Sequence, residues 1–331
     1  MGVKYRERVS QLGGHSVPRT LSTKNASGRD IIDPMLEIIR HHPSIHMLLS
    51  TKVDRIITNP TTGRVHGIEV SDTLLEESFE IGCTKALILA AGGFSADVEF
   101  RAIQNPLLNS EVMTTNQPGA TAEMMKEALK SGAMSVQLSR IQLGSGTSPD
   151  EPGFGQAPLF CAGAGFPYGI IIDPETSQRF INELASPEER NMSILKKGHP
   201  VICLADTRGA KHSIHKNLKK LEPAVRSFDS LTAMAGAFNL DEVILAHTVA
   251  NYNRGLLAED RQDEFGKPLR EDALPIEIPP FYATRLWPKV HHCMGGLQID
   301  NDARVINIDG HPIPGLFAAG EIVGGVHGAV S

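Results

Sequence analysis

The first apolar pattern along the chain has helical spacing. In DIIDPMLEIIRH, residues 30–41, apolar side chains recur three and four positions apart. Asp33 can cap this segment, and Pro34 suits the first turn of a helix. The pattern therefore predicts a short helix over 30–41.

Shorter apolar segments then predict strands. Residues 45–59 and 63–71 are two such segments, joined by the turn NPTTG, and a third lies near 78–81. LILA, within KALILAAGGFS (85–95), is a continuous apolar run, which is typical of a strand buried on both faces. The glycine turn after it would lie at the carboxyl end of the strand, where open α/β sheets bind ligands.

The middle of the chain mixes helical and strand patterns. TAEMMKEALKSG (121–132) predicts a helix that ends at Gly132, and the Gly-, Pro- and Ser-rich segment 144–158 predicts a long loop. Two strands joined by a turn at 174–177 are expected within 168–183, and a buried strand at 201–206. Helical patterns follow at 207–220, 228–238 and 241–259, the last beginning at Asp241.

Strand patterns return near the end of the chain. GLQIDNDARVIN (296–307) predicts a hairpin with NDA at its turn, and 313–329 predicts a buried strand that ends in a cluster of glycines. The succession predicts an α/β sheet domain over 1–139, an inserted α+β domain over 140–290, and a return to the first domain over 291–331.

The composition and net charge of the chain exclude several classes of function. The chain has 331 residues, a net charge of −6 and 5% aromatic residues, and its patterns are those of a soluble globular protein. An acidic balance without a basic run argues against nucleic acid as a partner. No apolar run is long enough to span a membrane. The four cysteines are far apart and form no CxxC motif, which excludes a zinc ribbon readable from the sequence.

One short segment concentrates reactive side chains. In VHHCMGG, residues 290–296, His291, His292 and Cys293 are adjacent and are followed by two glycines. They suggest a zinc site or a nucleophile with its base. Adjacent residues on a strand point to opposite faces, however, so the three cannot share one tetrahedral ion. A small buried thiol is the simpler interpretation of Cys293.

Five segments occur in an order that resembles a known family: LILAAGGFS, TTNQPGA, RFINE, VHHCMGGLQID and GLFAAGEIVGGVHGA. The order is similar to that in the flavoprotein subunits of soluble fumarate reductases and flavocytochrome c, within the succinate dehydrogenase/fumarate reductase superfamily. LGGHSVPR (12–19) resembles the NADH-dependent and fungal-type members. The resemblance covers essentially the whole chain.

The resemblance implies a Rossmann-like FAD-binding domain and a capping domain that closes over the flavin. It implies hydride transfer from flavin N5 to a carbon–carbon double bond beside a carboxylate, with an arginine of the cap donating the proton to the other carbon. The small unsaturated carboxylate is thus the expected substrate. The electron donor, a haem, FMN or NADH-linked protein or domain, would lie outside this chain.

The same resemblance assigns roles to individual residues. It implies that His291 binds a substrate carboxylate and acts in catalysis, with His292, Gly325 and His327 beside the substrate. Arg190 is the implied proton donor. The positions implied to contact FAD are Val53, Ala91, Gly92, Gly93, Asn116, Gly320, Glu321 and Gly324.

The chain departs from the family pattern in ways that affect these expectations. The GxGxxG unit, expected upstream of LGGHS, is absent, and Ser331 stands where the family has an arginine that clamps a second carboxylate. A family histidine is replaced by Gly144, and a Thr-Glu pair of the cap is replaced by Ala162 and Gly163. Three residues after TNQPGA also differ, Ala122–Met124. A partial chain is therefore expected, together with a substrate other than fumarate.

Three hypotheses about function follow. The first is an FAD-dependent enoate reductase of the fumarate reductase type. The second is a truncated or split flavoprotein module without catalytic activity of its own. The third, a hydrolase that uses the histidines and the cysteine near residue 290, has the least support. For Arg190 the alternative is a solvated helix charge, and for His291 it is a buried structural histidine.

Overall fold

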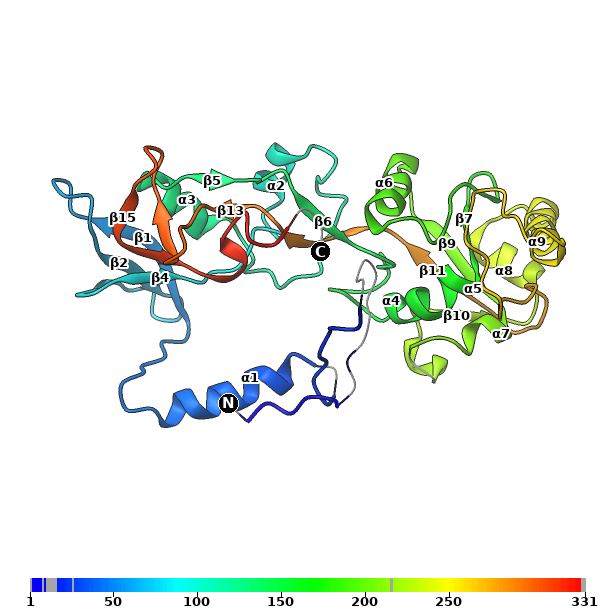
Figure 1. Cartoon of the computed structure of the whole chain (residues 1–331), viewed down its shortest axis with the longest axis horizontal. Coiled ribbons are helices and arrows are strands. Elements are labelled where there is room, and N and C mark those ends of the chain that lie inside the picture. Colours follow the sequence, from blue (N-terminus) through cyan, green and yellow to red (C-terminus); the bar gives the residue numbers. More distant parts are fainter. Residues whose placement is uncertain (1, 8, 10–16, 26, 215–216, 329–331) are drawn as a thin grey trace. The chain divides into compact units, whose positions relative to one another are not determined.

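The computed structural model describes residues 2–7, 9, 17–25, 27–214 and 217–328 (Figure 1). Expectations that concern Ser331, and most of LGGHSVPR, lie outside these residues. The chain forms two compact units, one of residues 1–52 and 71–77 and the other of 53–70 and 78–331. The predicted domain boundaries at 139/140 and 290/291 stay predictions.

The first unit contains the predicted N-terminal helix. Helix α1 (Arg29–His41) confirms the helix, but Asp33 does not cap it. The helix begins after Gly28, and the carboxylate of Asp30 accepts hydrogen bonds from the backbone and side chain of Asn25, at 2.8 and 2.9 Å. Local hydrogen bonding therefore moved the helix start four residues ahead of the predicted cap.

A three-stranded sheet follows in the order β1-β2-β3, with bounds Thr51–Thr58, Val65–Asp72 and Ser78–Gly82. The prediction placed the first strand from residue 45, but it begins only at Thr51. Ser50 has φ 54°, a left-handed conformation that interrupts extended backbone. The two strands after it lie where the pattern predicted them.

A second sheet brings together segments that are far apart in the sequence. β4 (Leu87–Leu89) pairs in parallel with β15 (Pro312–Ala318), which pairs antiparallel with β14 (Arg304–Ile306). The prediction that β4 is buried on both faces is wrong, because Ile88 is 66% exposed while Leu89 is buried. β4 is the edge strand of this three-stranded sheet, and alternation along it turns Ile88 away from the core. That core includes Phe94, Phe100, Met125, Leu297 and Leu316.

Two separate two-stranded sheets follow. β6 (Ile141–Gly144) pairs antiparallel with β12 (Lys289–Cys293), and β5 (Ser135–Val136) pairs antiparallel with β13 (Gly296–Leu297). The predicted hairpin at 296–307 forms only in part. Its turn at Asp300–Arg304 is present, but β13 and β14 belong to different sheets and a single bridge joins Ile299 to Val305.

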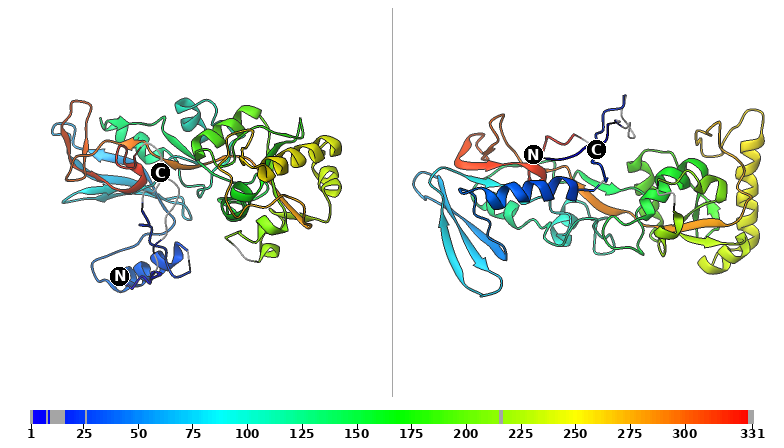
Figure 2. Two further views of the ribbon diagram at one scale, coloured as in Figure 1. Left: turned by 45° about the vertical axis from the view of Figure 1, so that its right-hand side comes forward. Right: turned by 90° about the horizontal axis from the view of Figure 1, so that it is seen from below.

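The inserted segment forms a five-stranded antiparallel sheet in the order β10-β11-β9-β7-β8. The bounds are Arg226–Phe228, Phe281–Leu286, Val201–Ala205, Ile170–Asp173 and Gln178–Arg179. All of β9 is buried, because Cys203 faces one apolar core and Ile202 and Leu204 face another. Helices α8 (Leu231–Phe238) and α9 (Glu242–Leu257) cover the second core, as Figure 2 shows.

The predicted helix over 207–220 is wrong. Among the described residues of this range, 207–214 and 217–220, the helical elements are α7 (Thr207–Ala210) and the start of a 3-10 turn, η2 (Leu218–Leu221). Ser213 is buried, and its hydroxyl and the N–H of Ile214 both donate to the carbonyl of Leu159, which pulls the chain out of a helical path. The remaining helical segments are α2 (Val98–Gln104), α3 (Glu123–Lys130), α4 (Ala157–Phe160), the π-helical η1 (Cys161–Gly165), α5 (Phe166–Tyr168), α6 (Pro187–Lys197) and η3 (Gly320–Ile322).

Other predictions are confirmed by these bounds. The turn at 174–177 separates β7 from β8, α3 ends just before Gly132, and Asp241 caps α9. Within the described residues, no helix is both long enough and apolar enough to cross a membrane.

Candidate functional site

Strand β12 changes register at the adjacent histidines, and the two histidines contact different partners. The pairing with β6 shifts between Val290 and His292, so His291 is the extra residue. Nδ1 of His291 lies 2.7 Å from the hydroxyl of Thr115, whereas Nδ1 of His292 lies 3.2 Å from Oε1 of Glu321. The two histidines therefore have different partners, in agreement with the expectation that they do not share one ion.

Cys293 completes the segment, and its free thiol is not accessible to solvent. Its side chain is fully buried, and burial raises its pKa to about 12. Its backbone N–H donates to Oε1 of Glu321 at 2.8 Å. A buried thiol with a raised pKa is a poor nucleophile, which agrees with the interpretation of Cys293 as a structural residue.

Glu321 connects three of the predicted positions. The carboxylate accepts the Cys293 N–H and pairs with His292, whose ring stands edge-on to the ring of His327 with 4.9 Å between centroids. Burial alone would raise the pKa of Glu321, but the hydrogen bonds from His292 and Cys293 outweigh it and hold the pKa below its ordinary value. Glu321 is therefore an anion held at the end of strand β15.

The glycine turn after β4 packs directly against this carboxylate. A Cβ on Gly93 would lie 2.5 Å from Oε1 of Glu321, so only glycine fits there without displacing the carboxylate. Gly92 has φ 82° and Gly320 has φ 80°, and a Cβ on either would meet nothing within 4 Å. The two turns thus combine one closely packed glycine with two that leave space beside the backbone.

The remaining predicted positions have different surroundings. A Cβ on Gly324 would lie 2.4 Å from the backbone nitrogen of Gly296, so close backbone packing already explains that glycine. Gly325 has φ 82° and is exposed, Ala91 is exposed, and Val53 is a half-buried residue of β1.

Asn116 links the two sides of the site. Its side-chain amide donates to the hydroxyl of Ser95 at 2.7 Å and to the carbonyl of His291 at 2.9 Å. Ser95 is fully buried and follows the glycine turn by two residues. The glycine turn and the histidine strand are therefore held together by one side chain.

Arg190 lies on α6, and it is not a solvated helix charge. The side chain is 6% exposed and stacks on Phe166, with Cζ 4.1 Å from the ring centroid. Nη1 donates to the carbonyls of Glu183 and Ala185 at 2.9 and 2.8 Å, and Nη2 donates to the hydroxyl of Ser145. Nε is buried and has no partner within the part of the chain described. Burial lowers the pKa of Arg190.

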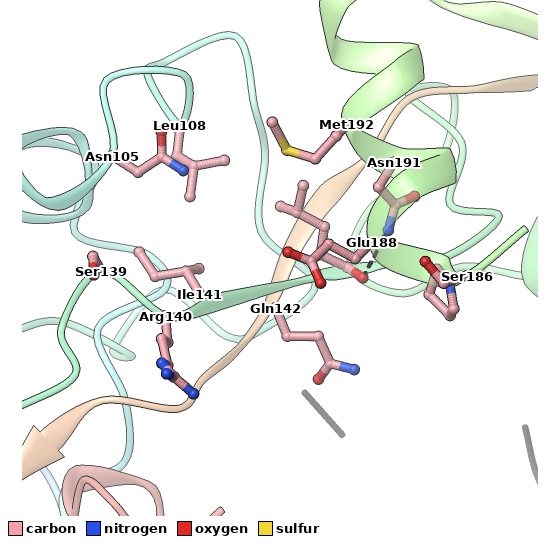
Figure 3. A pocket seen from close by; sticks show the side chains of 12 residues that line it. Asn105, Leu108, Ser139, Arg140, Ile141, Gln142, Ser186, Glu188, Asn191 and Met192 are labelled. Carbon is pink, nitrogen blue, oxygen red and sulfur yellow. Dashed lines mark hydrogen bonds between the residues drawn. The ribbon is translucent and has the colours of Figure 1, made fainter. Parts of the chain in front are cut away.

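A cavity of about 530 Å³ lies between β6 and the first turns of α6 (Figure 3). Figure 3 shows Glu188, Asn191 and Met192 of α6 facing the strand, and the amide of Asn191 donates to the carbonyl of Leu143 at 3.0 Å. The volume is within the range of small-molecule sites. None of the site residues predicted from the sequence lines it.

Three residues that the sequence did not single out belong to the histidine side of the site. Thr115 contacts His291, the ring of Phe154 lies 5.2 Å from that of His291, and Lys289 is fully buried two residues before it. Of these three, only Lys289 could have been found from the sequence. It lies in the otherwise apolar segment LWPKV, and a lysine in such a segment indicates a buried charge that is paired.

Replacing Gly93 by alanine is expected to destabilise the site. The new Cβ would push the Glu321 carboxylate away from the Cys293 N–H and from His292, at a loss of about 1.5–3 kcal/mol for hydrogen bonds to a charged group. Denaturant unfolding of Gly93→Ala measures this. Gly236→Ala is the matched control, because a Cβ there meets nothing within 4 Å and lies within α8. Equal stability of the two variants would contradict the expectation.

The fold and these contacts define a flavoprotein. The chain belongs to the family described as the FAD binding domain, whose model matches residues 2–331. The predicted family, α/β fold class and FAD cofactor are confirmed by this match and by the structural likeness that follows.

The chain is similar to several flavoprotein reductases. It is 37% identical to the acrylate reductase flavoprotein subunit of Shewanella woodyi, over 99% of this chain and 66% of the relative. It is 28% identical to the urocanate reductase of Eggerthella lenta, over 98% of this chain and 53% of the relative. The open conformation of a flavocytochrome c3 fumarate reductase matches 99% of this chain with a TM-score of 0.85 and 26% identity, over 56% of that structure. The chain thus spans about half to two thirds of the length of these proteins.

Proposed function

We propose that this chain forms the flavin- and substrate-binding part of an FAD-dependent reductase that reduces the carbon–carbon double bond of an unsaturated carboxylate. The observation that carries the proposal is the arrangement of the bulged histidine strand beside Glu321 and the glycine turns. The similarity to reductases of acrylate, urocanate and fumarate supports the same chemistry.

The residues present suit FAD. Buried Nε2 of His327 has no partner among the described residues, and the His327 ring stands edge-on to His292, which pairs with Glu321. A Cβ on Gly92 or Gly320 would meet nothing within 4 Å, so both turns leave space beside the backbone. Ala91, Gly92, Gly93, Asn116, Gly320, Glu321 and Gly324 would hold the cofactor, with Val53 toward its adenine end. When bound, FAD supplies the hydride to the substrate.

The histidines serve the substrate carboxylate. His291 presents the ring edge that Thr115 leaves unoccupied, while His292 is held by Glu321. His327 and Gly325 stand beside them. A carboxylate bound here accepts hydrogen bonds from an imidazole, and it spreads the charge that develops on the neighbouring carbon during reduction.

Arg190 is the proposed proton donor. Its guanidinium is buried, is hydrogen-bonded to carbonyls and a hydroxyl, and has no carboxylate among the partners described. Burial disfavours the charged form and so makes the group a stronger acid than an exposed arginine. The electrons would come from a haem, FMN or NADH-linked protein or domain outside this chain.

The visible spectrum of the purified chain tests the proposal. After incubation with FAD and gel filtration, flavin absorption in the protein peak and viologen-linked reduction of acrylate are the expected results. A folded, colourless protein that reduces no enoate would contradict the proposal and favour the split-module hypothesis. If the chain retains flavin but reduces no enoate, the proposed cofactor is correct and the proposed substrate is wrong.

Binding of the carboxylate is expected to strengthen as the pH falls below 6.5. Burial lowers the pKa of His291 below its ordinary value of 6.5, and the charge of His292 acts in the same direction while Glu321 opposes it. His291 is therefore neutral above 6.5 and gains a proton, with its attraction for a carboxylate, only below that pH. Titrations with acrylate should show that Kd falls as the pH is lowered from 7.5 to 5. The His291→Gln variant should show a Kd that depends less on pH. A pH-independent Kd in the unaltered protein would contradict the assignment.

A further inference from the structure

An exposed aromatic side chain lies beside His291 on a loop that the structure holds in place. Phe154 is 41% exposed, and its ring is 5.2 Å from the His291 ring with 37° between the planes. Single exposed apolar side chains are common on protein surfaces, so the position of this ring, rather than its exposure, carries the argument. Its neighbour here is the histidine to which the substrate carboxylate is assigned.

The loop owes its position to the strand that carries His291. The ammonium group of Lys289, fully buried on β12, donates to the carbonyls of Glu151 and Gly153, the latter at 2.9 Å. Phe154 follows Gly153 directly. Because Lys289 and His291 are two residues apart on one strand, the ring of Phe154 is tied to the position of His291.

The other side of the loop is held as well. The Glu151 carboxylate accepts the N–H groups of Gln156 and Ala157 at 2.7 and 2.9 Å, where α4 begins. Gly153 and Gly155, on either side of Phe154, have φ 57° and 75°, which other residues adopt only with strain. The loop is therefore built to present one particular side chain.

Three cationic side chains of this part of the chain are engaged elsewhere. Lys289 is bound to backbone carbonyls, Arg190 to carbonyls and a hydroxyl, and Arg285 to Asp150 at 2.7 Å. Gly144, whose Cβ would lie 3.6 Å from Cβ of His291, offers no side chain at all. Among the described residues, then, these side chains provide no second carboxylate clamp opposite His291.

We infer that Phe154 determines specificity, and that the substrate is a monocarboxylic enoate with a planar, aromatic or conjugated substituent on its alkene. The inference rests on the proposed function. His291 would take the one carboxylate, and the substituent would lie against the Phe154 ring. The short distance between the two rings favours a substituent that begins directly at the double bond.

Binding of trans-cinnamate, acrylate and fumarate to the full chain tests this inference. Calorimetric titration with FAD present should show cinnamate binding more tightly than the other two. Phe154→Ala should raise the Kd of cinnamate by roughly tenfold, since a lost aromatic pair alone accounts for about 2- to 13-fold. Acrylate, which has no such substituent, should change less than about twofold. Phe154→Leu should fall between, because it keeps apolar contact and loses the ring.

Phe79→Ala is the matched control, because Phe79 lies on β3 and is 45% exposed. It should leave all three affinities unchanged. The inference is overturned if cinnamate does not bind, if Phe154→Ala weakens cinnamate and acrylate equally, or if fumarate binds best. If the chain reduces enoates, but its preference among them is the same in Phe154→Ala as in the unaltered protein, this inference fails and the proposed function stands. Cinnamate binding that depends on Phe154, in a chain that reduces no enoate, sinks the proposed function and the substrate assignment with it, and leaves Phe154 as a residue that contacts an aromatic carboxylate.

Discussion

Glu183→Ala is expected to lower the free energy of unfolding by about 3–5 kcal/mol, the usual effect of removing one partner from a buried ion pair. Glu183 is fully buried and accepts hydrogen bonds from Nε and Nη2 of Arg179, at 3.0 and 2.8 Å, and from the N–H of Ile171 at 2.9 Å. Nζ of Lys267 lies 3.4 Å from the same carboxylate. Alanine would leave the buried Lys267 without this counter-ion and the Ile171 N–H without an acceptor.

Chemical denaturation of the purified protein measures the effect. Glu183→Gln should be less damaging than Glu183→Ala, because an amide oxygen can still accept the Ile171 N–H. Asp302→Ala is the surface control, since Asp302 is 73% exposed in its pair with Arg304; it should change stability little. Equal stability of the Glu183 and Asp302 variants would show that the buried cluster is not needed to hold the five-stranded sheet.

Arg190→Lys is expected to lower kcat for enoate reduction by about 10²- to 10⁴-fold, the range for loss of a positioned general acid. Lysine keeps the charge and much of the volume, but one ammonium cannot reproduce the planar fork that binds Glu183, Ala185 and Ser145 together. Flavin content and unfolding midpoint should stay close to those of the unaltered protein. Steady-state kinetics with a viologen donor measure the loss.

Lys196→Ala, on the exposed side of the same helix, should retain full activity. Arg190→Ala is the less informative change, because it also opens a cavity beside Phe166. Undiminished kcat in Arg190→Lys would remove the proton-donor role from Arg190.

Local signals in the sequence predicted local structure well. Asp241 was expected to begin a helix, and its carboxylate does accept the N–H of Ile244 at 2.9 Å. A cap depends on residues three positions apart, so a single sequence contains all that is needed. The turn between β7 and β8 was predicted for the same reason.

The misplaced starts of α1 and β1 have local causes, but the larger errors arose where distant segments decide the outcome. The apolar run at β4 indicated burial on both faces, but what covers Ile88 depends on which strands lie beside it. The helical pattern after residue 207 was overridden by the Ser213 and Ile214 bonds to Leu159, about 55 positions away. Phe154 and Lys289 were missed because they are 135 residues apart in the sequence. Their roles become visible only when the structure shows that Lys289 binds the backbone beside Phe154.

The candidate site was predicted by resemblance more than by pattern. His292, Glu321, Gly93 and His327 were chosen as motif positions, and the structure brings them into contact. The pattern alone could not show that His291 is the extra residue of a bulge, because a register shift depends on the partner strand β6.

The parallel pairing of β4 with β15 has a consequence for how the chain is made. Roughly 220 residues separate Leu89 from Pro312, and at about 5–20 residues per second a ribosome needs some 10–45 s to synthesise them. During that interval the partner strand for β4 does not yet exist, while the five-stranded sheet can already form behind it. The insertion can therefore fold before β4 finds its partner, because β15 is synthesised only after the whole insertion.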